Sequence, residues 1–414
     1  MTAAPTLAAL PPLPPVTVTA VELLTVELPL RVPFTTSFGR QTTRSIPLIR
    51  VRAEEADGWG ELVTMPAPVY SEEFTAGAVL ALRDHLIPAV LAEGPRLTAE
   101  AVGGRTRHLH GQRMALGALE LAVLDAQLRA GERSLATHLG AVRDRVPTGV
   151  SVGIPDGGVA ELIDQVERYL DDGYLRVKAK IQPGTDVAPL TALRERFGAS
   201  LALQVDANAA YDPDDADDVA ALDALDELGL VMVEQPFATD RVLDHARHAQ
   251  RWRTPVCLDE SIHHAVAARD AIALGATAIV NVKLGRVGGV LESVRVRDVC
   301  RERAVPVWCG GMLESGVGRA ANVALAALDG FSLPGDTSAS ARYWRQDLTE
   351  PFELVDGHVE VPSGPGIGRT PRPEILVAAE VEQLGRWDGA LTGRHPTRST
   401  VRADPSPAQP GTAS

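Results

Sequence analysis

The chain has 414 residues, of which 45% are hydrophobic and 23% are charged, a composition that excludes collagen-like, coiled-coil and wholly disordered proteins. The 54 acidic residues outnumber the 40 basic ones, and the formal net charge of −14 opposes binding to nucleic acid or to an anionic membrane surface. Three widely spaced cysteines, Cys257, Cys300 and Cys309, form no CxxC pair, which favours free thiols in a reducing compartment. We therefore expect a globular cytoplasmic protein.

Both ends of the chain have the composition of tails. Residues 1–15 alternate Ala and Leu with Pro and contain no basic residue, so they lack the charged start of a signal peptide. Residues 391–414 contain almost no large apolar residue, so burial would not offset the entropy that ordering costs. We expect disordered tails at 1–15 and 391–414. No stretch approaches the roughly 20 apolar residues that span a membrane.

The first predicted domain begins with three β-branched runs, at residues 17–28, 46–52 and 59–63. Gly and Pro turns separate these runs, a pattern typical of an antiparallel meander. Helical signals follow, since Ser71-Glu72-Glu73 resembles an acidic first turn and residues 113–129 carry apolar side chains at helical spacing. Strands followed by segregated helices predict an α+β domain over residues 16–145.

Short apolar strands alternate with helices after Val146. The predicted strands are 148–152, 176–181, 201–205, 230–233, 256–258, 278–282, 305–308 and, more weakly, 331–333. Polar residues stand where five successive strands end, 24 to 28 residues apart: Lys180, Asp206, Glu234, Asp259 and Lys283. This rhythm predicts a TIM-type (β/α) barrel over residues 146–370, with 371–390 packing back, and an active site at the C-terminal strand ends. An open doubly wound sheet would instead concentrate its chemistry at one switch point.

Three carboxylates, Asp206, Glu234 and Asp259, follow three consecutive predicted strands and would lie side by side on one rim. Carboxylates this close repel one another unless a cation joins them. Oxygen ligands without His or Cys favour Mg²⁺ or Mn²⁺ over Zn²⁺. A single acid at a strand end is more often a solvated residue or a helix cap, but the set predicts one divalent cation held by these three residues.

Lys178 and Lys180 are two residues apart on a predicted strand, so both ammonium groups would face the barrel interior. Each would lower the pKa of the other, and a partly neutral lysine can act as a base. Lys283 would approach from across the barrel. A lone lysine is more often a surface residue. Lysines around a divalent metal indicate removal of a proton α to a carboxylate, with the metal stabilising the enediolate.

Five motifs together resemble the muconate lactonising subgroup of the enolase superfamily. They are Lys178-Ala-Lys180, Val205-Asp206-Ala-Asn208, Glu234-Gln-Pro236, Asp259-Glu260-Ser261 and Lys283. The resemblance implies a modified, enolase-like barrel with the N-terminal α+β domain as a capping lid, and a lysine or histidine base that acts with Mg²⁺.

Narrower motifs are similar to the o-succinylbenzoate synthase / N-succinylamino acid racemase family over about residues 18–370. These are Trp308-Cys-Gly-Gly-Met-Leu-Glu314, Pro334-Gly-Asp-Thr-Ser338 and Gly364-Pro-Gly-Ile-Gly368. The resemblance implies dehydration of 2-succinyl-6-hydroxy-2,4-cyclohexadiene-1-carboxylate to 2-succinylbenzoate, a step of menaquinone biosynthesis, together with N-succinylamino acid racemisation. A physiological N-acylamino acid racemase is the alternative. The family commonly forms dimers or octamers, so a homo-oligomer is expected.

Carried over by position, the resemblance makes Lys180 and Lys283 the acid/base pair and Lys178 an electrostatic aid to the substrate carboxylate. In the dehydration Lys180 would remove the proton and return it to the departing hydroxyl. In racemisation Lys180 and Lys283 would act on opposite faces. The implied substrate-binding residues are Ser151, Asn208, Arg286, Glu314 and, from the lid, Phe34, Phe38 and Tyr70. For the three aromatic residues a place in the core is an equal alternative.

Arg286 occupies the end of a segment that the family often has as Lys-Pro-Gly-Arg and that here reads Lys283-Leu-Gly-Arg286. Its permanent charge would lower the pKa of Lys283 and favour a basic role for that lysine. The resemblance associates this arginine with subfamilies that also racemise.

Three other functions are less consistent with these residues. An acid-sugar dehydratase would ordinarily have a histidine in place of Lys283. A dipeptide epimerase typically has Asp-x-Asp after the eighth strand, where this chain reads Asp336-Thr337-Ser338. A non-catalytic barrel would be expected to have lost at least one of the three acids or three lysines, and all are present.

Overall fold

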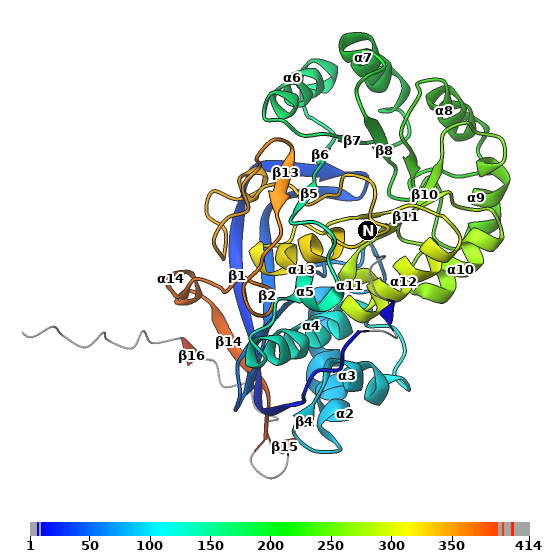
Figure 1. Cartoon of the computed structure of the whole chain (residues 1–414). Coiled ribbons are helices and arrows are strands. Elements are labelled where there is room, and N and C mark those ends of the chain that lie inside the picture. Colours follow the sequence, from blue (N-terminus) through cyan, green and yellow to red (C-terminus); the bar gives the residue numbers. More distant parts are fainter. Residues whose placement is uncertain (1–5, 8–9, 388–390, 393–398, 401–414) are drawn as a thin grey trace, which may run out of the picture.

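Two long antiparallel strands organise the first domain. In the computed structural model, which describes residues 6–7, 10–387, 391–392 and 399–400, β1 (Val16–Thr36) pairs with β2 (Gly39–Ala53) along most of its length. β3 (Gly58–Glu61) extends the sheet on one side and β14 (Glu380–Trp387) on the other, both antiparallel. Figure 1 shows β14 beside β1 although the two are far apart in the sequence. The predicted meander is therefore confirmed, and the chain returns to it near its end.

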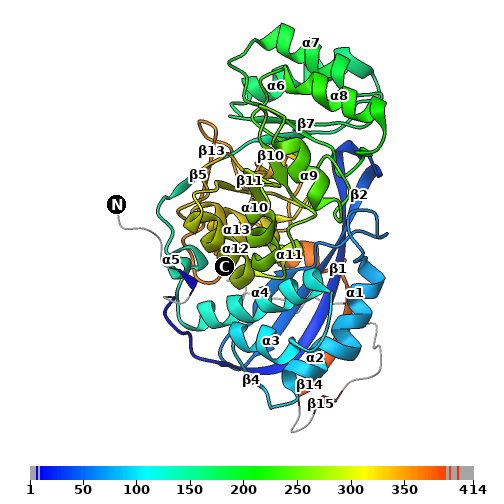
Figure 2. The same cartoon turned by 90° about the vertical axis from the view of Figure 1, so that its right-hand side faces the viewer.

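Helix α4 (Arg113–Ala130) covers one face of this sheet and lies between it and the second domain (Figure 2). Small residues permit the contact, since a Cβ on Gly60 would lie 2.0 Å from the carbonyl oxygen of Ala118. The other elements of this domain are α1 (Thr75–Ala81), a π-helical turn at Leu82–Leu86, α2 (Ile87–Leu91), β4 (Arg96–Leu97) and α3 (Ala99–Thr106).

The helix expected to open at Ser71-Glu72-Glu73 begins four residues later, at Thr75. The reason is a distant partner for Glu73. Its carboxylate accepts the backbone N–H groups of Arg113 at 2.5 Å and Met114 at 2.9 Å, which are free donors in the first turn of α4. Glu73 thus caps a helix 40 residues further along the chain instead of beginning its own.

Seven parallel strands form the second domain, in the order β12-β11-β10-β9-β8-β7-β6. They are β6 (Val150–Val152), β7 (Val177–Lys180), β8 (Leu203–Asp206), β9 (Val233–Glu234), β10 (Val256–Leu258), β11 (Ile279–Val282) and β12 (Val307–Cys309). The segment from Phe331 to Gly335 fills the eighth place through single bridges, to Val307 on one side and Thr148 on the other. Pro334, which has no N–H, interrupts it, so the weak eighth strand does not form a regular ladder. The predicted (β/α) barrel is confirmed.

Helices on the outside of the barrel follow most of its strands (Figures 1 and 2). They are α6 (Gly158–Asp171), α7 (Val187–Phe197), α8 (Ala216–Asp226), α9 (Val242–Ala249), α10 (Ala265–Ala273), α12 (Val290–Glu302) and α13 (Gly316–Ala326), with the short α11 (Leu284–Val287) directly after β11. The remaining elements are α5 (Leu135–Leu139), β5 (Arg145–Pro147), a 3₁₀ turn at Ser340–Arg342, β13 (His358–Glu360) and α14 (Pro373–Leu376). No helix in the described part of the chain combines the length and apolar character that crossing a membrane requires.

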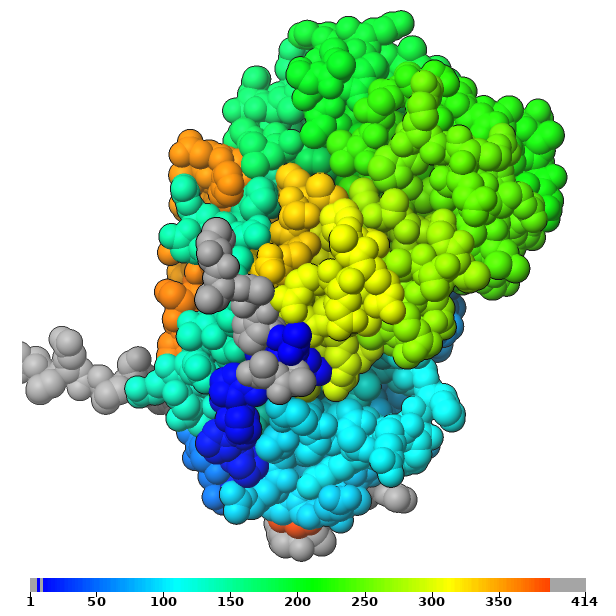
Figure 3. Space-filling model, turned by 45° about the vertical axis from the view of Figure 1, so that its right-hand side comes forward, coloured from blue at the N-terminus to red at the C-terminus, as the bar shows by residue number. Residues whose placement is uncertain are grey.

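The segments expected to be tails lie partly outside the described residues. Of 391–414, the structure describes only β15 (Leu391–Thr392) and β16 (Ser399–Thr400). Of 1–15, residues 1–5 and 8–9 are outside. The rest of this first segment contacts both domains (Figure 3), since the N–H of Leu7 donates to Asp298 of α12 at 2.9 Å and Gln127 of α4 donates to the carbonyl of Pro14 at 2.7 Å.

His245 of α9 supports the loop that follows β9. The N–H of Phe237 donates to its Nε2 at 3.3 Å, and its Nδ1 lies 2.9 Å from the carbonyl oxygen of Arg241. The ring therefore accepts on one side and donates on the other, as only neutral imidazole can. Burial lowers the pKa of His245 to about 4.

We expect His245 to make the free energy of unfolding depend on pH. Its pKa is lower in the folded than in the unfolded chain, so its contribution is complete above pH 6.5 and is lost as the pH falls toward 4, by roughly 3 kcal/mol. Urea unfolding of the wild type and of His245→Gln at several pH values measures this. The stability difference between the two proteins should shrink on acidification, and a constant difference would contradict the assignment.

Candidate active site

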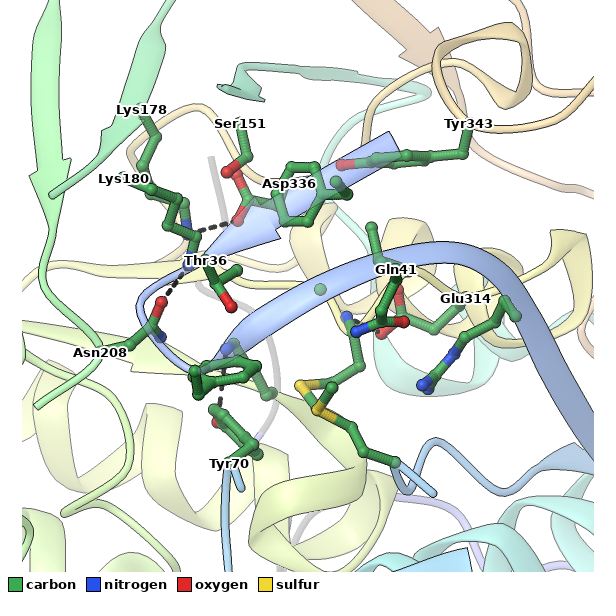
Figure 4. A pocket seen from close by; sticks show the side chains of 18 of the residues that line it. Thr36, Gln41, Tyr70, Ser151, Lys178, Lys180, Asn208, Glu314, Asp336 and Tyr343 are labelled. Atoms are coloured by element: carbon green, nitrogen blue, oxygen red, sulfur yellow. Dashed lines mark hydrogen bonds and ion pairs between the residues drawn. The ribbon is translucent and has the colours of Figure 1, made fainter. Parts of the chain in front are cut away.

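A cavity lies between the C-terminal ends of the barrel strands and the tip of the β1–β2 hairpin (Figure 4). The first domain contributes to its lining Phe34, Thr36, Phe38, Gln41, Arg44, Met65 and Tyr70. The barrel contributes Ser151, Lys178, Lys180, Asn208 and Lys283, and the region after β12 contributes Glu314, Arg319, Asp336 and Tyr343 among others. Both domains thus line the cavity.

Lys180 and Lys283 reach the cavity from opposite sides of the barrel. Lys180 ends β7, and Lys283 directly follows β11. Between these strands stand β8, β9 and β10 on one side, and β12, the segment from Phe331 and β6 on the other. Both side chains line the cavity, so a molecule bound in it has one lysine on each side.

The carboxylates lie between the two lysines along the rim. In the parallel ladder Lys180 pairs in register with Asp206, and Asp206 with Glu234. Asp259 directly follows β10, the next strand. All three acids are fully buried. The regular one-strand, one-helix repeat has therefore brought the predicted acids to adjacent places.

Each of these acids faces a lysine. The Nζ of Lys178 lies 3.2 Å from Asp206 Oδ2 and 3.1 Å from Glu234 Oε2. Lys180 Nζ is 2.6 Å from Asp206 Oδ2. Lys283 Nζ is 2.7 Å from Asp259 Oδ2. The site therefore consists of closely interleaved positive and negative groups shielded from water.

Burial is the largest influence on the pKa of all three lysines, and it acts to lower it. For Lys180 burial prevails, helped by the charge of Lys178, and the pKa is below the usual value. For Lys178 the attraction of Asp336, Glu234 and Asp206 outweighs burial and raises the pKa. We expected Lys178 and Lys180 to lower each other's pKa, and the pKa of Lys180 alone is lowered.

The pKa of Lys283 is also raised, because the attraction of Tyr70, Glu260 and the rim acids outweighs burial. The net lowering of the Lys283 pKa that was expected from Arg286 is therefore not found. The guanidinium of Arg286 instead pairs with Asp259 and donates from Nε to the carbonyl of Ile262 at 2.7 Å. Arg286 is outside the cavity lining, and its contact with substrate stays a prediction.

The donor chemistry at the rim fits a hard divalent cation. Asp206, Glu234 and Asp259 supply buried carboxylate oxygens only, the ligands that Mg²⁺ and Mn²⁺ prefer. Nearby, the buried Oε2 of Glu260 has no hydrogen-bond partner. As the side chains stand, no three acidic, histidine or cysteine side chains among the described residues are arranged to hold a metal ion. The rim carboxylates are instead engaged by lysine, arginine and amide groups. The three ligands stay a prediction.

Amide side chains orient the rim acids, and the sequence motifs did not reveal most of them. Glu234 accepts from Gln204 Nε2 at 2.9 Å and from Asn281 Nδ2 at 2.7 Å. Gln235, whose φ is 39°, accepts the N–H of Asp259 at 3.0 Å through its side chain. These bonds hold the ends of neighbouring strands together and fix where their carboxylates point.

The predicted lid residues lie at the cavity. Phe34, Phe38 and Tyr70 all line it, and Phe34 also packs edge-to-face against Tyr343 at 6.4 Å between ring centroids. The hydroxyl of Tyr70 donates to Asp259 Oδ1 at 3.0 Å, and Lys283 Nζ is 3.3 Å from the same hydroxyl. The first domain therefore touches the polar centre of the barrel.

Three of the four predicted polar contacts, Ser151, Asn208 and Glu314, line the cavity too, and two of them have atoms free to bind a ligand. The hydroxyl of Ser151 and one carboxylate oxygen of Glu314 are buried without a hydrogen-bond partner. Asn208 accepts from Lys180 at 2.6 Å and donates to Glu260 at 3.0 Å. Figure 4 shows Ser151 and Asp336 near the lysines and Glu314 across the cavity from them.

Sequence reasoning missed several cavity residues. Asp336 directly follows the eighth strand position, as the other rim residues follow their strands, so the same spacing argument predicts its place at the cavity. Arg44 and Arg319 also line the cavity. They lie on β2 and on α13, away from any strand end, and no signal in the sequence marks them.

Comparison with known proteins gives consistent matches for both domains. The family described as mandelate racemase / muconate lactonizing enzyme, N-terminal domain, matches residues 18–140, and the one described as enolase C-terminal domain-like matches residues 161–375. An N-succinylamino acid racemase from Amycolatopsis sp. is 55% identical over 89% of this chain and 99% of its own length. An o-succinylbenzoate synthase from Geobacillus stearothermophilus is 45% identical over 83% of this chain and 90% of its own. A solved structure of an enolase superfamily member from Listeria innocua has a TM-score of 0.83 at 38% identity, covering 89% of this chain and 100% of that one.

Proposed function

We propose, on the premise that this chain belongs to the mandelate racemase / muconate lactonizing enzyme family of the enolase superfamily, that it is an o-succinylbenzoate synthase that also racemises N-succinylamino acids. A relative named o-succinylbenzoate synthase is 45% identical to it, and a relative named N-succinylamino acid racemase is 55% identical. The observation that carries the proposal is the pair of lysines on opposite sides of the cavity, with three buried carboxylates on the barrel rim between the strands that carry them. This arrangement suits removal of a proton α to a carboxylate.

In the dehydration, Lys180 would act alone on the reacting atoms. Its Nζ accepts the proton α to the ring carboxylate of 2-succinyl-6-hydroxy-2,4-cyclohexadiene-1-carboxylate as that C–H bond breaks. The electron pair forms the new double bond while the bond to the hydroxyl breaks, and the proton leaves with the hydroxyl as water. The lowered pKa of Lys180 favours the neutral form that this step needs. Lys283 and Lys178 would remain charged, Lys178 beside the substrate carboxylate.

In racemisation, both lysines would react. One removes the α-proton of the N-succinylamino acid, and the other delivers a proton from the opposite face. The positions of Lys180 and Lys283 across the barrel support this second activity, so an N-acylamino acid racemase as the physiological function is the alternative.

Two cavity arginines fit substrates with a second carboxylate. Arg44 and Arg319 line the cavity, and the Nε atom of each is buried without a hydrogen-bond partner. A succinyl group ends in a carboxylate, which a guanidinium recognises through paired N–H donors. The cavity therefore offers cationic partners for both ends of such a substrate.

We include in the proposal one Mg²⁺ or Mn²⁺ per site, held by Asp206, Glu234 and Asp259. When bound, the cation would stabilise the negative charge that develops on the substrate carboxylate. A cytoplasmic location and a dimer or octamer are further parts of the proposal. The free, buried state of Cys257, Cys300 and Cys309 is compatible with a reducing compartment.

Removal of divalent cations with EDTA is expected to abolish turnover, and Mg²⁺ or Mn²⁺ is expected to restore it. Lysines alone give the carbanion too little stabilisation. The test uses protein whose metal content has been measured before and after dialysis. Full activity in protein shown to be free of metal would contradict the proposed mechanism.

The proposed function itself is tested with two substrates. Purified protein with Mg²⁺ is incubated with 2-succinyl-6-hydroxy-2,4-cyclohexadiene-1-carboxylate, and aromatic product is followed by absorbance. A parallel reaction with N-succinyl-L-phenylalanine is followed by polarimetry. Product in the first reaction supports the synthase. A change in optical rotation without aromatic product would support the racemase activity and contradict the synthase activity. Absence of reaction with both substrates would refute the proposal.

A further inference from the structure

Among the residues that the structure describes, two carboxylates line the cavity, Asp336 and Glu314. Both oxygens of Asp336 have a cationic partner. Oδ2 lies 2.7 Å from Lys178 Nζ, and Oδ1 lies 3.0 Å from a terminal nitrogen of Arg176. A carboxylate engaged in this way has little capacity left for a positive group on a ligand.

Arg176 lies behind the cavity wall, two residues before Lys178. Its side chain is 2% exposed. The guanidinium stacks over the ring of Trp308 at 5.0 Å and donates to the carbonyl of Pro334 at 2.8 Å. A Cβ on Gly149 would come within 2.6 Å of it, so glycine there leaves room for the guanidinium. The fold thus provides a specific place for this arginine.

The two cationic partners of Asp336 are not equivalent. Lys178 also pairs with Asp206 and Glu234. Arg176 forms an ion pair with Asp336 and, in the described part of the chain, with no other carboxylate. Although burial raises the pKa of Asp336, Lys178 and Arg176 together hold it at about 2. Arg176 is therefore the cation dedicated to neutralising this acid.

We propose that Arg176 is a specificity-determining residue: by pairing with Asp336 it prevents that carboxylate from binding a substrate ammonium group, so that the cavity accepts acyl groups ending in a carboxylate and rejects those bearing an ammonium group. This inference rests on the proposed function for its choice of N-acylamino acids as ligands. Without Arg176, the charge of Asp336 would be shared with Lys178 alone. The cavity would then favour acyl groups that bear an ammonium group over acyl groups that end in a carboxylate.

The test compares two ligands that differ in the charge of the acyl group. N-succinyl-L-phenylalanine carries a carboxylate there, and L-alanyl-L-phenylalanine carries an ammonium group. Dissociation constants for both are measured by calorimetry with Mg²⁺ present, in the wild type, Arg176→Met and Arg176→Lys. Arg247→Met removes an exposed charge on α9, 65% exposed, and is the control for net charge.

We expect the ratio of the two dissociation constants to shift at least 10-fold toward the dipeptide in Arg176→Met and less than 2-fold in Arg176→Lys and Arg247→Met. The double variant Arg176→Met/Asp336→Asn should lose the shift. An unchanged ratio in folded Arg176→Met, or a shift that persists in the double variant, would overturn the proposal.

A second variant keeps the proposal testable if Arg176→Met does not fold. In Asp336→Asn the guanidinium of Arg176 loses its acid partner, so the ratio should move further toward the succinyl ligand. An unchanged ratio, or movement toward the dipeptide, would overturn the role of Arg176. The ratio is a binding measurement, so absence of turnover in the wild type would count against the proposed function and not against this inference.

Discussion

Lys180→Arg is expected to abolish both o-succinylbenzoate formation and exchange of the α-proton on the β7 side of the substrate, with kcat at least about 10³-fold lower. The guanidinium keeps the positive charge beside Asp206, 2.6 Å from the lysine nitrogen, but it does not deprotonate near neutral pH. Aromatic product is measured by absorbance, and α-proton exchange by NMR in D₂O.

The charge-conserving substitution makes this result interpretable. Loss of activity by unfolding is checked by thermal melting, and metal affinity is measured separately, because Lys180 touches Asp206, a predicted ligand. With both close to the wild-type values, dehydration retained above about a tenth of the wild-type rate would show that another group removes the proton.

The barrel and its rim were predictable because both depend on a local repeat. Each strand, loop and helix takes 24 to 28 residues between rim positions, and parallel pairing then places Lys180, Asp206 and Glu234 in register. Neither step needs knowledge of distant contacts. The spacing of charged residues in the sequence therefore already determined which groups would be neighbours.

The features that were missed or misplaced depend on contacts between segments far apart in the chain. Glu73 caps α4 rather than its own helix. Tyr70 bonds to Asp259, 189 residues away. Arg176 pairs with Asp336, 160 residues away. Hydrophobic periodicity carries no information about such pairs, and the pKa of a lysine such as Lys178 depends on them.

The same distinction explains why the roles of the two reacting lysines cannot be assigned by their pKa values alone. Burial and the neighbouring carboxylates act in opposite directions on each, and the balance differs between Lys180 and Lys283. Their positions on opposite sides of the barrel do not depend on that balance. An experiment on stereochemistry therefore tests the geometry more directly than a pH profile does.

Lys283→Arg is expected to abolish racemisation of N-succinylamino acids, by at least about 10³-fold, while the α-proton of one enantiomer still exchanges through Lys180. Arginine retains a positive charge opposite Asp259, 2.7 Å from the lysine nitrogen, but cannot supply or accept a proton near neutral pH. In D₂O, NMR should show deuterium entering one enantiomer without its inversion. Lys180→Arg should lose exchange of that same enantiomer and retain exchange of the other.

Two outcomes would contradict this assignment. Loss of exchange for the same enantiomer in both variants, with metal affinity intact, would place both lysines on one face of the substrate, against their separation by β8, β9 and β10. Racemisation retained in Lys283→Arg would require a second acid on that side, and the candidate from the first domain is Tyr70, whose hydroxyl is 3.3 Å from Lys283 Nζ. The double variant Lys283→Arg/Tyr70→Phe then tests whether Tyr70 is this second acid, because racemisation that depends on the tyrosine hydroxyl ends when that hydroxyl is removed.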